Sequence, residues 1–521
     1  SFAKGVLEEV MKKDYEGVIL TTCCDSIRRL YDVLKEEFPE KFIYMLDTPR
    51  ITKEPGITLY EQRIRTMIRE YEKFSGKTFN EKKFLEYIKD KDQEQQYARK
   101  QGVLNIGIIG ARANDSMKEI LAENKANVAF DLTCTGLGRK ILVDEKEILA
   151  GYTRGLLSQF PCMRMEQAAN RDELIRRFAG SVDGIIYHTV QFCDNYAYEY
   201  AWLKEWLDRP MLLLETDYTR QSSGQIRTRI EAFLESLAPE IHRTKTTGKG
   251  DKAMYVMGID SGSTSTNAVI MDQDRKIRAF SVVRTGAKSG VSAQKALEEV
   301  LEKADLSRED ISWIVSTGYG RVSIDFADEN VTEISCHGKG AHYFNPKIRT
   351  ILDIGGQDSK AIHLNEKGEV KDFVMNDKCA AGTGRFLEMI ARTLEVSLDE
   401  LGAIALTSTE KIEITSMCSV FAESEVISLI ANNKEKADIA EGVCHAIANK
   451  AFGLLRRVGM EPDFMMTGGV AKNPGVVRAV EEKIGASLYI CEEPEIVGAA
   501  GAALYALEKC GFCSGTGRER F

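Results

Sequence analysis

Short apolar runs alternate with helix-length segments along this chain, and this alternation limits the folds that the chain can adopt. Residues 42–46, 104–109, 128–132 and 184–187 have the length and composition of strands, and the segments between them are long enough for helices. Strands separated by helices at this spacing predict parallel sheets covered by helices. We therefore expect an α/β fold, with two Rossmann-like lobes in the first half of the chain.

A polar stretch rich in Lys, Thr and Gly interrupts this pattern at residues 238–253. Because it has no helical or strand periodicity, it predicts a linker between two domains. We expect a first domain at 1–237, a second at 254–508 and a mobile tail at 509–521. The chain does not begin with Met and enters a helix-like segment at once, so the first domain is expected to lack its natural start.

The composition excludes several classes of protein. The 521 residues include 70 Lys and Arg against 79 Asp and Glu, a formal net charge of −9 with no basic block, so no nucleic-acid partner is expected. No uncharged apolar run approaches the roughly 18 residues that span a membrane. The 12 cysteines are dispersed and no secretory signal precedes them, which predicts a cytoplasmic protein with metal or redox chemistry rather than disulfides.

Three Gly-rich turns in the second half each follow an apolar strand, at residues 258–266, 349–362 and 463–473. Turn amides and hydroxyls can donate to phosphate oxygens, and a strand-end carboxylate such as Asp260 can hold Mg²⁺ through water. In this order the turns resemble the two phosphate motifs and the adenosine motif of the actin, sugar-kinase and heat-shock ATPase superfold. The residues expected to bind ATP or ADP are Gly262, Ser263, Thr264, Ser265, Thr266, Gly355, Gly356, Gln357, Gly468, Gly469 and Lys472.

Two cysteines between the second and third turns each lie next to the start of a predicted helix. Cys379 precedes a segment whose apolar positions recur every four residues, and Cys418 opens another. Helix N-termini stabilise thiolates. Two thiolates are too few for a four-ligand site, but two copies in a symmetric dimer supply four, which suits a [4Fe–4S] cluster on the two-fold axis. Two buried structural cysteines are the alternative interpretation.

Residues 254–507 closely resemble the ATP-dependent activators of 2-hydroxyacyl-CoA dehydratases and benzoyl-CoA reductases, with signatures at 376–386 and 418–428. The resemblance implies that Cys379 and Cys418 bind a cluster shared between two subunits of a homodimer. It also implies that ATP binding moves the two cluster-bearing helices and drives an electron into a partner.

The same resemblance assigns catalytic roles within the nucleotide site. It implies that Asp260 and Asp353 serve Mg²⁺ and that Gln357 lies near the terminal phosphate. Residues 316–321, Ser-Thr-Gly-Tyr-Gly-Arg, also match a loop of the family. The sequence suggests no role for that loop.

Five cysteines of the first half lie in loops, several of them directly after predicted strands, and the carboxyl ends of parallel strands converge on one crevice. This half resembles the iron–sulfur subunits of the same dehydratases and reductases, and the related double-cubane-cluster reductases. The resemblance implies a second iron–sulfur cluster, either a [4Fe–4S] cubane or a double cubane, which needs six thiolates. The expected ligands are Cys23, Cys24, Cys134, Cys162 and Cys193.

We expect Cys336, Cys444 and Cys491 to be structural. Cys510 and Cys513 form a C-x-x-C in the tail, which is a weak signal for a metal or redox role. The predicted function is ATP-dependent, low-potential electron transfer from the dimer cluster to the N-terminal cluster, which reduces a small molecule. An external donor of the ferredoxin or flavodoxin type would supply the electron. A 2-hydroxyacyl-CoA dehydratase with a built-in activator, acting on an acyl-CoA, is the close alternative. A non-redox ATPase or kinase with structural cysteines is the alternative of another class.

Overall fold

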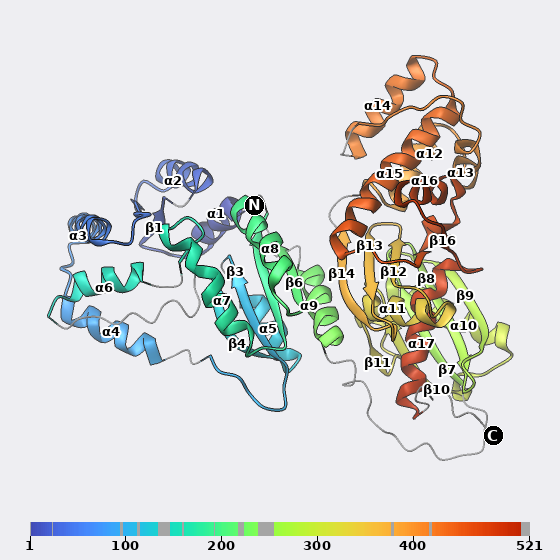
Figure 1. Ribbon diagram of the computed structural model, residues 1–521, viewed down its shortest axis with the longest axis horizontal. Helices are drawn as coiled ribbons and strands as arrows, with labels where there is room; N and C mark the ends of the chain where they lie inside the picture. Colours follow the sequence, from blue (N-terminus) through green and yellow to red (C-terminus); the bar gives the residue numbers. More distant parts are fainter. Residues whose placement is uncertain are drawn as a thin grey trace. The chain divides into compact units, whose positions relative to one another are not determined.

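The described residues of the computed structural model separate into two compact units, Ser1–Leu237 and Ala238–Phe521 (Figure 1). Each unit has its own sheets and its own hydrophobic core. The residues that the structure describes are 2–22, 24–93, 97–111, 115–133, 146–158, 161–191, 193–216, 223–237, 255–376, 380–415 and 419–511. The expected linker and five cysteines lie outside these ranges, namely Cys23, Cys134, Cys379, Cys418 and Cys513.

The first unit begins with a small lobe on a two-stranded parallel sheet. β1 (Gly17–Thr21) pairs with β2 (Phe42–Leu46), and α2 (Asp25–Glu37) connects the two strands. The apolar residues of α2 recur every three or four positions, so they form one face that packs into the core of the lobe. The other helices of this lobe are α1 (Phe2–Lys12), α3 (Glu54–Ser75), α4 (Glu81–Gln93) and α6 (Ile148–Leu157).

A second lobe of this unit has a four-stranded, all-parallel sheet in the order β4-β3-β5-β6. Its central strands are almost completely buried, as expected for a parallel sheet with helices on both faces. The strands are β3 (Asn105–Gly110), β4 (Asn127–Thr133), β5 (Gly184–Val190) and β6 (Met211–Thr216). The helices are α5 (Asp115–Glu123), α7 (Arg171–Ala179), α8 (Asp194–Trp206) and α9 (Ser223–Leu237).

The second unit has two five-stranded sheets with the same topology. In each sheet three antiparallel strands are followed by two parallel ones. One sheet has β7 (Tyr255–Ser261), β8 (Ser265–Asp272), β9 (Ile277–Arg284), β10 (Ile311–Thr317) and β11 (Glu329–Asn330). The other has β12 (Thr350–Ile354), β13 (Ser359–Leu364), β14 (Val370–Asn376), β15 (Phe464–Thr467) and β16 (Leu488–Tyr489). This duplicated topology is that of the actin, sugar-kinase and heat-shock ATPases, so the α/β prediction is confirmed.

Helices of the second unit fall into two groups. Three pack on the first sheet or between the sheets: α10 (Ser289–Ala304), α11 (Glu333–Phe344) and α17 (Val497–Lys509). The others gather at one end of the unit (Figure 1). They are α12 (Gly384–Thr393), α13 (Leu398–Ala405), α14 (Ser419–Ala431), α15 (Lys436–Val458) and α16 (Pro474–Ile484).

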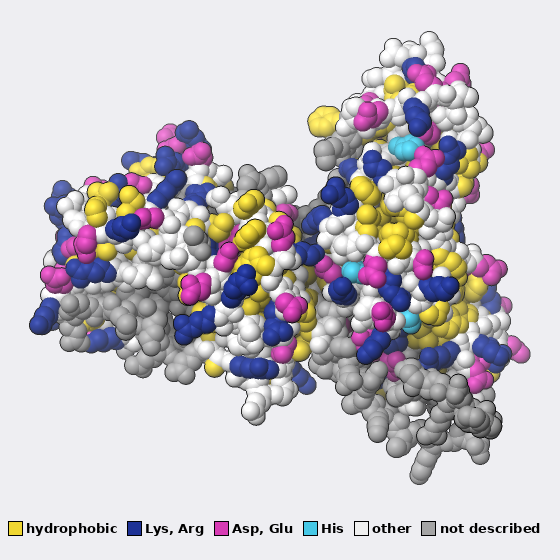
Figure 2. Space-filling model, viewed as in Figure 1, with side chains coloured by type: hydrophobic (Ala, Val, Ile, Leu, Met, Phe, Trp, Pro, Cys, Tyr) yellow, Lys and Arg dark blue, Asp and Glu magenta, His cyan; other side chains and the backbone are white. Residues whose placement is uncertain are grey.

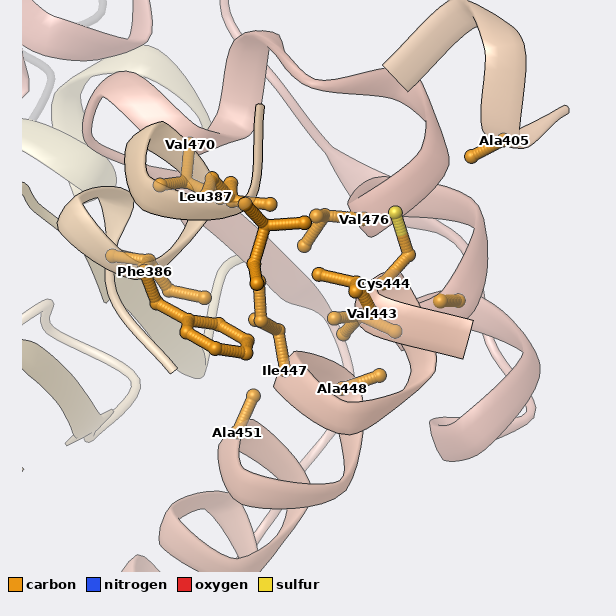
Figure 3. Close-up of a cluster of buried hydrophobic side chains, with 14 of the residues drawn as sticks. Phe386, Leu387, Ala405, Val443, Cys444, Ile447, Ala448, Ala451, Val470 and Val476 are labelled. Carbon is orange, nitrogen blue, oxygen red and sulfur yellow. The ribbon is translucent and has the colours of Figure 1, made fainter. Parts of the chain in front are cut away.

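The core beneath this helical end contains one of the cysteines expected to be structural (Figure 3). Phe386 of α12 packs near Ile447 and Ala451 of α15, and Cys444 lies in the same cluster. Cys444 is 1% exposed, and burial raises the pKa of its thiol to about 12. Cys336 and Cys491 are also buried. The predicted burial of these three cysteines is confirmed.

Among the residues that the structure describes, no helix combines the length and the apolar character needed to cross a membrane.

Candidate functional site

A cavity of about 410 Å³ in the second unit is lined by residues from all three Gly-rich turns. The β7–β8 turn, the β12–β13 turn and the segment after β15 meet there although they are far apart in the sequence. Most of the residues expected to bind nucleotide and Mg²⁺ line this cavity, namely Asp260, Gly262, Ser263, Thr264, Ser265, Asp353, Gly355, Gly356, Gly468, Gly469 and Lys472.

Two residues from the same predictions are not among the lining residues. Thr266 follows Ser265 on β8, and successive side chains on a strand point to opposite faces. Thr266 is therefore buried away from the cavity, where its hydroxyl hydrogen-bonds to the hydroxyl of Thr285 at 2.8 Å. Gln357 is exposed at the β12–β13 turn. Its placement near a terminal phosphate stays a prediction.

Asp260 and Asp353 come from the two different sheets and face the same helix residue. His337 of α11 lies between them, with Nε2 3.7 Å from Oδ2 of Asp260 and Nδ1 3.8 Å from Oδ1 of Asp353. Both carboxylates are buried, at 8% and 3% exposure. Burial raises the pKa of Asp260, whose neighbouring cations do not compensate for it. Two buried carboxylates on opposite sides of a cavity suit a divalent cation with oxygen ligands.

A different balance of charges holds Asp353 ionised. Burial alone would raise the pKa of its carboxyl, but His337, Lys360 and a hydrogen bond from Thr467 outweigh that effect, so the pKa lies well below its usual range. Thr467 Oγ1 donates to Asp353 Oδ1 at 2.8 Å, and Lys360 Nζ donates to Oδ2 at 3.1 Å. Asp353 is therefore an anion before any ligand arrives.

Lys360 is a buried cation that the sequence analysis missed. Its Nζ lies 2.7 Å from Asp358, 3.1 Å from Asp353 and 3.6 Å from Glu333, and its side chain is 5% exposed. Burial would lower the pKa of Lys360, but these carboxylates outweigh burial and raise it well above its ordinary value. Burial raises the pKa of Glu333 to about 8. This part of the cavity thus combines acidic groups with a buried positive charge.

Several buried polar atoms of lining residues have no hydrogen-bond partner within the described part of the chain. They include Asn267 Oδ1, Glu333 Oε1, His337 Nδ1 and Asn473 Nδ2. A buried polar atom without a partner costs free energy, so such atoms mark a place where a ligand or ion supplies the partner. These atoms fit a nucleotide with its cation.

The far side of the cavity carries a further charged group. Lys472 Nζ lies 2.8 Å from Glu495 and 2.9 Å from Glu493, and Lys472 and Glu495 line the cavity together with Leu398 and Asp399. Burial would lower the pKa of Lys472, but the two glutamates outweigh it and raise the pKa. Leu387, Leu398 and Val470 line the cavity as well and offer apolar surface against which a base can pack.

In the first unit, the described cysteines lie in the loops where they were expected. Cys24 is the N-cap of α2, Cys193 is the N-cap of α8, and Cys162 precedes α7. All three are half-buried, unlike the structural cysteines of the second unit. Within the described ranges, no three His, Cys, Asp or Glu side chains gather closely enough to hold a metal. Half-exposed thiols at helix starts suit metal ligation, but their convergence stays a prediction.

A buried ion pair supports the loop that carries Cys162. Arg171 of α7 donates to the carbonyl of Pro161 and, through both Nε and Nη2, to the carboxylate of Glu199 on α8. Tyr187 of β5 donates to the same carboxylate at 2.6 Å, and burial raises the pKa of Tyr187 far enough to keep it protonated. Arg171 and Glu199 are each 2% exposed.

The fold and the acidic, glycine-lined cavity define an ATPase of the actin and sugar-kinase class. Comparison with known families makes this specific. Residues 257–506 match the BadF/BadG/BcrA/BcrD ATPase family, and residues 1–105 and 98–237 match the family described as 2-hydroxyglutaryl-CoA dehydratase, D-component. The chain belongs to the BadF/BadG/BcrA/BcrD ATPase family and joins its ATPase region to a dehydratase-component region, as the two resemblances predicted.

Individual relatives match the second half. The activator of lactoyl-CoA dehydratase from Anaerotignum propionicum is 51% identical over 255 residues, covering 49% of this chain and 98% of that protein. The (R)-2-hydroxyglutaryl-CoA dehydratase activating ATPase from Acidaminococcus fermentans is 44% identical over 258 residues, covering 49% and 98%. The solved structure of the activator of the 2-hydroxyisocaproyl-CoA dehydratase from Clostridium difficile with bound ADPNP is 42% identical, covers 50% of this chain and 96% of that one, and has a TM-score of 0.48.

Proposed function

We propose that this protein couples ATP hydrolysis to the transfer of a low-potential electron from the ATPase unit to an iron–sulfur site in the first unit, which then reduces a small molecule. The observation that carries this proposal is a direct connection between the phosphate turn and the helix that follows Cys379. The amides of Gly384 and Arg385, which begin α12, donate to the carbonyls of Gly355 and Gly356 at 2.8 and 2.9 Å.

This connection is reinforced next to the phosphate turn. Ser359 Oγ donates to the carbonyl of Gly382 at 2.7 Å, so the loop that leads from Cys379 to α12 is bonded to the start of β13. A displacement of the β12–β13 turn by a terminal phosphate would therefore displace α12 with it. In this proposal, hydrogen bonds to residues 382–385, which follow Cys379 in the chain, transmit the nucleotide state.

The surroundings of the two helices fit a cluster shared between two copies of the chain. α12 and α14 pack together, with Thr393 Oγ1 donating to Glu423 Oε1 at 3.4 Å. α14 exposes Val420, Phe421 and Ile427 at 63%, 68% and 53%. Figure 2 shows hydrophobic side chains on the surface at this end of the unit. Exposed large apolar residues on the helix that follows Cys418 support a homodimer in which Cys379 and Cys418 of both copies supply four thiolates.

A bound [4Fe–4S] cluster would supply one-electron chemistry. The residues of the chain would hold the cluster and control when the electron is transferred. Asp260 and Asp353 would hold Mg²⁺, and the Gly-rich turns would hold ATP and then ADP. In the first unit, Cys24, Cys162 and Cys193 would hold the acceptor cluster together with Cys23 and Cys134. An external donor of the ferredoxin or flavodoxin type would reduce the ATPase unit.

Spectroscopy of the full-length protein, prepared without oxygen, tests this proposal. The iron content, the sulfide content and the electron paramagnetic resonance spectrum are measured with and without MgATP. The samples are the wild type, Cys379→Ser and Cys418→Ser. We expect both variants to lose the dimer cluster and keep the cluster of the first unit. Cys491→Ser is the matched control, because Cys491 is not an expected cluster ligand and a serine preserves the hydrogen bond that its Sγ donates to the carbonyl of Glu493 at 3.3 Å.

Two results would contradict the proposal. Loss of both clusters in Cys379→Ser would show that the two sites are not separate. Iron-free, colourless wild-type protein with full ATPase activity would support the non-redox ATPase instead.

A second candidate is a 2-hydroxyacyl-CoA dehydratase with a built-in activator. It is favoured by the match of the first unit to the dehydratase D-component, over residues 1–105 and 98–237. The reduced protein with MgATP would then eliminate water from a (R)-2-hydroxyacyl-CoA, and formation of the 2-enoyl-CoA is followed by mass spectrometry. The reductase would be favoured by two results together. Substrates of several acyl chain lengths would give no product, and other small molecules would oxidise the N-terminal cluster in the presence of MgATP.

A further inference from the structure

The loop at residues 316–321 lies at the nucleotide cavity, where Tyr319 is a lining residue. The first two residues of the loop, Ser316 and Thr317, end β10 of the first sheet of the ATPase unit, and the others follow that strand. Tyr319 donates its hydroxyl to Asp358 Oδ2 at 3.0 Å, and Asp358 lies in the β12–β13 turn of the second sheet. This hydrogen bond therefore joins the two halves of the ATPase unit at the place where their phosphate turns meet.

The loop holds Tyr319 in a fixed position against the strand that carries Asp260. Gly318 has a φ of 84°, which side chains disfavour, and a Cβ atom there would collide with Asp260 and Ser261. The Gly320 amide donates to the Ser261 carbonyl at 2.9 Å. The guanidinium of Arg321, 5% exposed, donates to the Gly318 carbonyl at 3.0 Å. A loop fixed at several backbone groups presents the tyrosine hydroxyl with little freedom.

Asp358 is itself held in place by Lys360, which belongs to the same sheet. Its Oδ2 accepts from Tyr319 and lies 2.7 Å from Nζ of Lys360, which also donates to Asp353 at 3.1 Å. Tyr319, Asp358 and Lys360 thus form a continuous path that ends at Asp353. The path begins beside Asp260, because Gly318 packs against that carboxylate.

The two phosphate turns also abut directly. A Cβ atom on Gly356 would overlap the side chain of Thr264, so the two turns are closely packed at this point. Each turn belongs to a different sheet, so contacts between the turns set the distance between them. A nucleotide phosphate and its cation must fit into that space.

We propose that Tyr319 is a positioning residue that fixes the separation of Asp260 and Asp353 through its hydrogen bond to Asp358. It does not touch the reacting atoms. It stabilises the arrangement in which both phosphate turns and both carboxylates engage one MgATP. This inference rests on the nucleotide site proposed above.

A double-mutant cycle tests it in the full-length protein with Tyr319→Phe, Asp358→Ala and the double variant, because alanine leaves the tyrosine hydroxyl no acceptor at position 358. The dissociation constant for MgATP, and KM and kcat for ATP hydrolysis, are measured for each. We expect Tyr319→Phe to weaken MgATP binding roughly tenfold, as for the loss of a hydrogen bond to a charged acceptor. The double variant should bind no more weakly than Asp358→Ala alone, because both substitutions remove the same bond.

Tyr343→Phe is the matched control. Tyr343 is half-buried in the same unit and donates to the Arg275 carbonyl at 2.7 Å, away from the cavity lining, so its loss should leave MgATP binding unchanged. A merely structural role for Tyr319 would lower the melting temperature of the nucleotide-free protein without changing the dissociation constant. Additive effects in the cycle, or an unchanged dissociation constant in Tyr319→Phe, would overturn the inference. A wild type that binds no MgATP would overturn the nucleotide site itself.

Discussion

The two units differ in how far the protein alone assembles its candidate site. In the ATPase unit, Asp260, Asp353 and Lys360 already lie around one cavity and neutralise part of each other's charge. In the described part of the first unit, Cys24, Cys162 and Cys193 lie at separate loops and no three ligands gather. Opposite charges hold a nucleotide site together before its ligand arrives, whereas thiols repel as thiolates and gain a shared position from the metal they bind.

The largest effect is expected at the buried ion pair of Arg171 and Glu199 in the first unit. Arg171→Leu should destabilise this unit by about 3–5 kcal/mol, because it leaves the carboxylate of Glu199 buried without its cation. Trp202 and Trp206 lie on α8 together with Glu199, so tryptophan fluorescence during urea unfolding reports on this region. Arg177→Leu is the control, because Arg177 is exposed on the same helix. Equal midpoints for the two variants would show that the first unit does not depend on this pair.

Thiol reactivity compares the cysteines of the two units directly. Burial raises the pKa of Cys444 to about 12 and that of Cys491 to about 11, so at pH 8 almost none of either thiol is ionised. The thiolate fraction of Cys444 should be reduced roughly a thousandfold relative to an ordinary cysteine. Mass spectrometry after brief alkylation of metal-free protein should find Cys162 and Cys193 modified first. Equal labelling of Cys444 would mean that the helical end of the ATPase unit opens readily.

A smaller effect is expected on ATP hydrolysis when a carboxylate of the nucleotide cavity is removed. Asp353→Asn should lower the rate of ATP hydrolysis roughly 100-fold, because it removes one of the two carboxylates proposed to hold Mg²⁺. Phosphate release measures this rate. Asp305→Asn is the matched control, since Asp305 is exposed at the end of α10 with a φ of 54°, a conformation that asparagine tolerates. A full rate in Asp353→Asn would remove Asp353 from the site.

The smallest effect concerns the connection between the cavity and α12. Ser359→Ala removes the hydrogen bond to the Gly382 carbonyl, which should cost about 1 kcal/mol of local stability. Hydrogen exchange of residues 380–386 should rise in the variant, and the protection that MgATP adds there should fall. An unchanged response to MgATP would place the coupling in the amides of Gly384 and Arg385 alone.

Local sequence patterns predicted much of the ATPase site, because each Gly-rich turn and its flanking strands are contiguous in the chain. The pattern did not identify Glu333 and His337, which lie on α11 and reach the cavity only through the packing of that helix between the sheets. Lys360 was missed although it follows the second turn, since a lysine at a strand start usually faces solvent. Thr266 was included with its turn, but strand alternation points it away.

In the first unit the strand-end loops and the two-lobed α/β fold could be predicted, whereas a metal site could not be located from the described residues. The sequence placed Cys23, Cys134 and Cys193 or their neighbours after strands, and in the structure Cys24 and Cys193 follow β1 and β5. The buried pair of Arg171 and Glu199 gave no signal, because charged residues on amphipathic helices are usually exposed.

The duplicated sheets give the nucleotide site an internal two-fold pseudo-symmetry. Asp260 pairs with Thr317 on one neighbouring strand and with Asn267 on the other, and Asp353 pairs in the same way with Thr467 and Lys360. Only one half carries the cation at this equivalent position, and the pKa values of the two aspartates accordingly shift in opposite directions. The pseudo-axis is therefore electrically polar, because Lys360 acts on both carboxylates but, of the two, hydrogen-bonds to Asp353. An entering divalent cation meets the less neutralised carboxylate at Asp260.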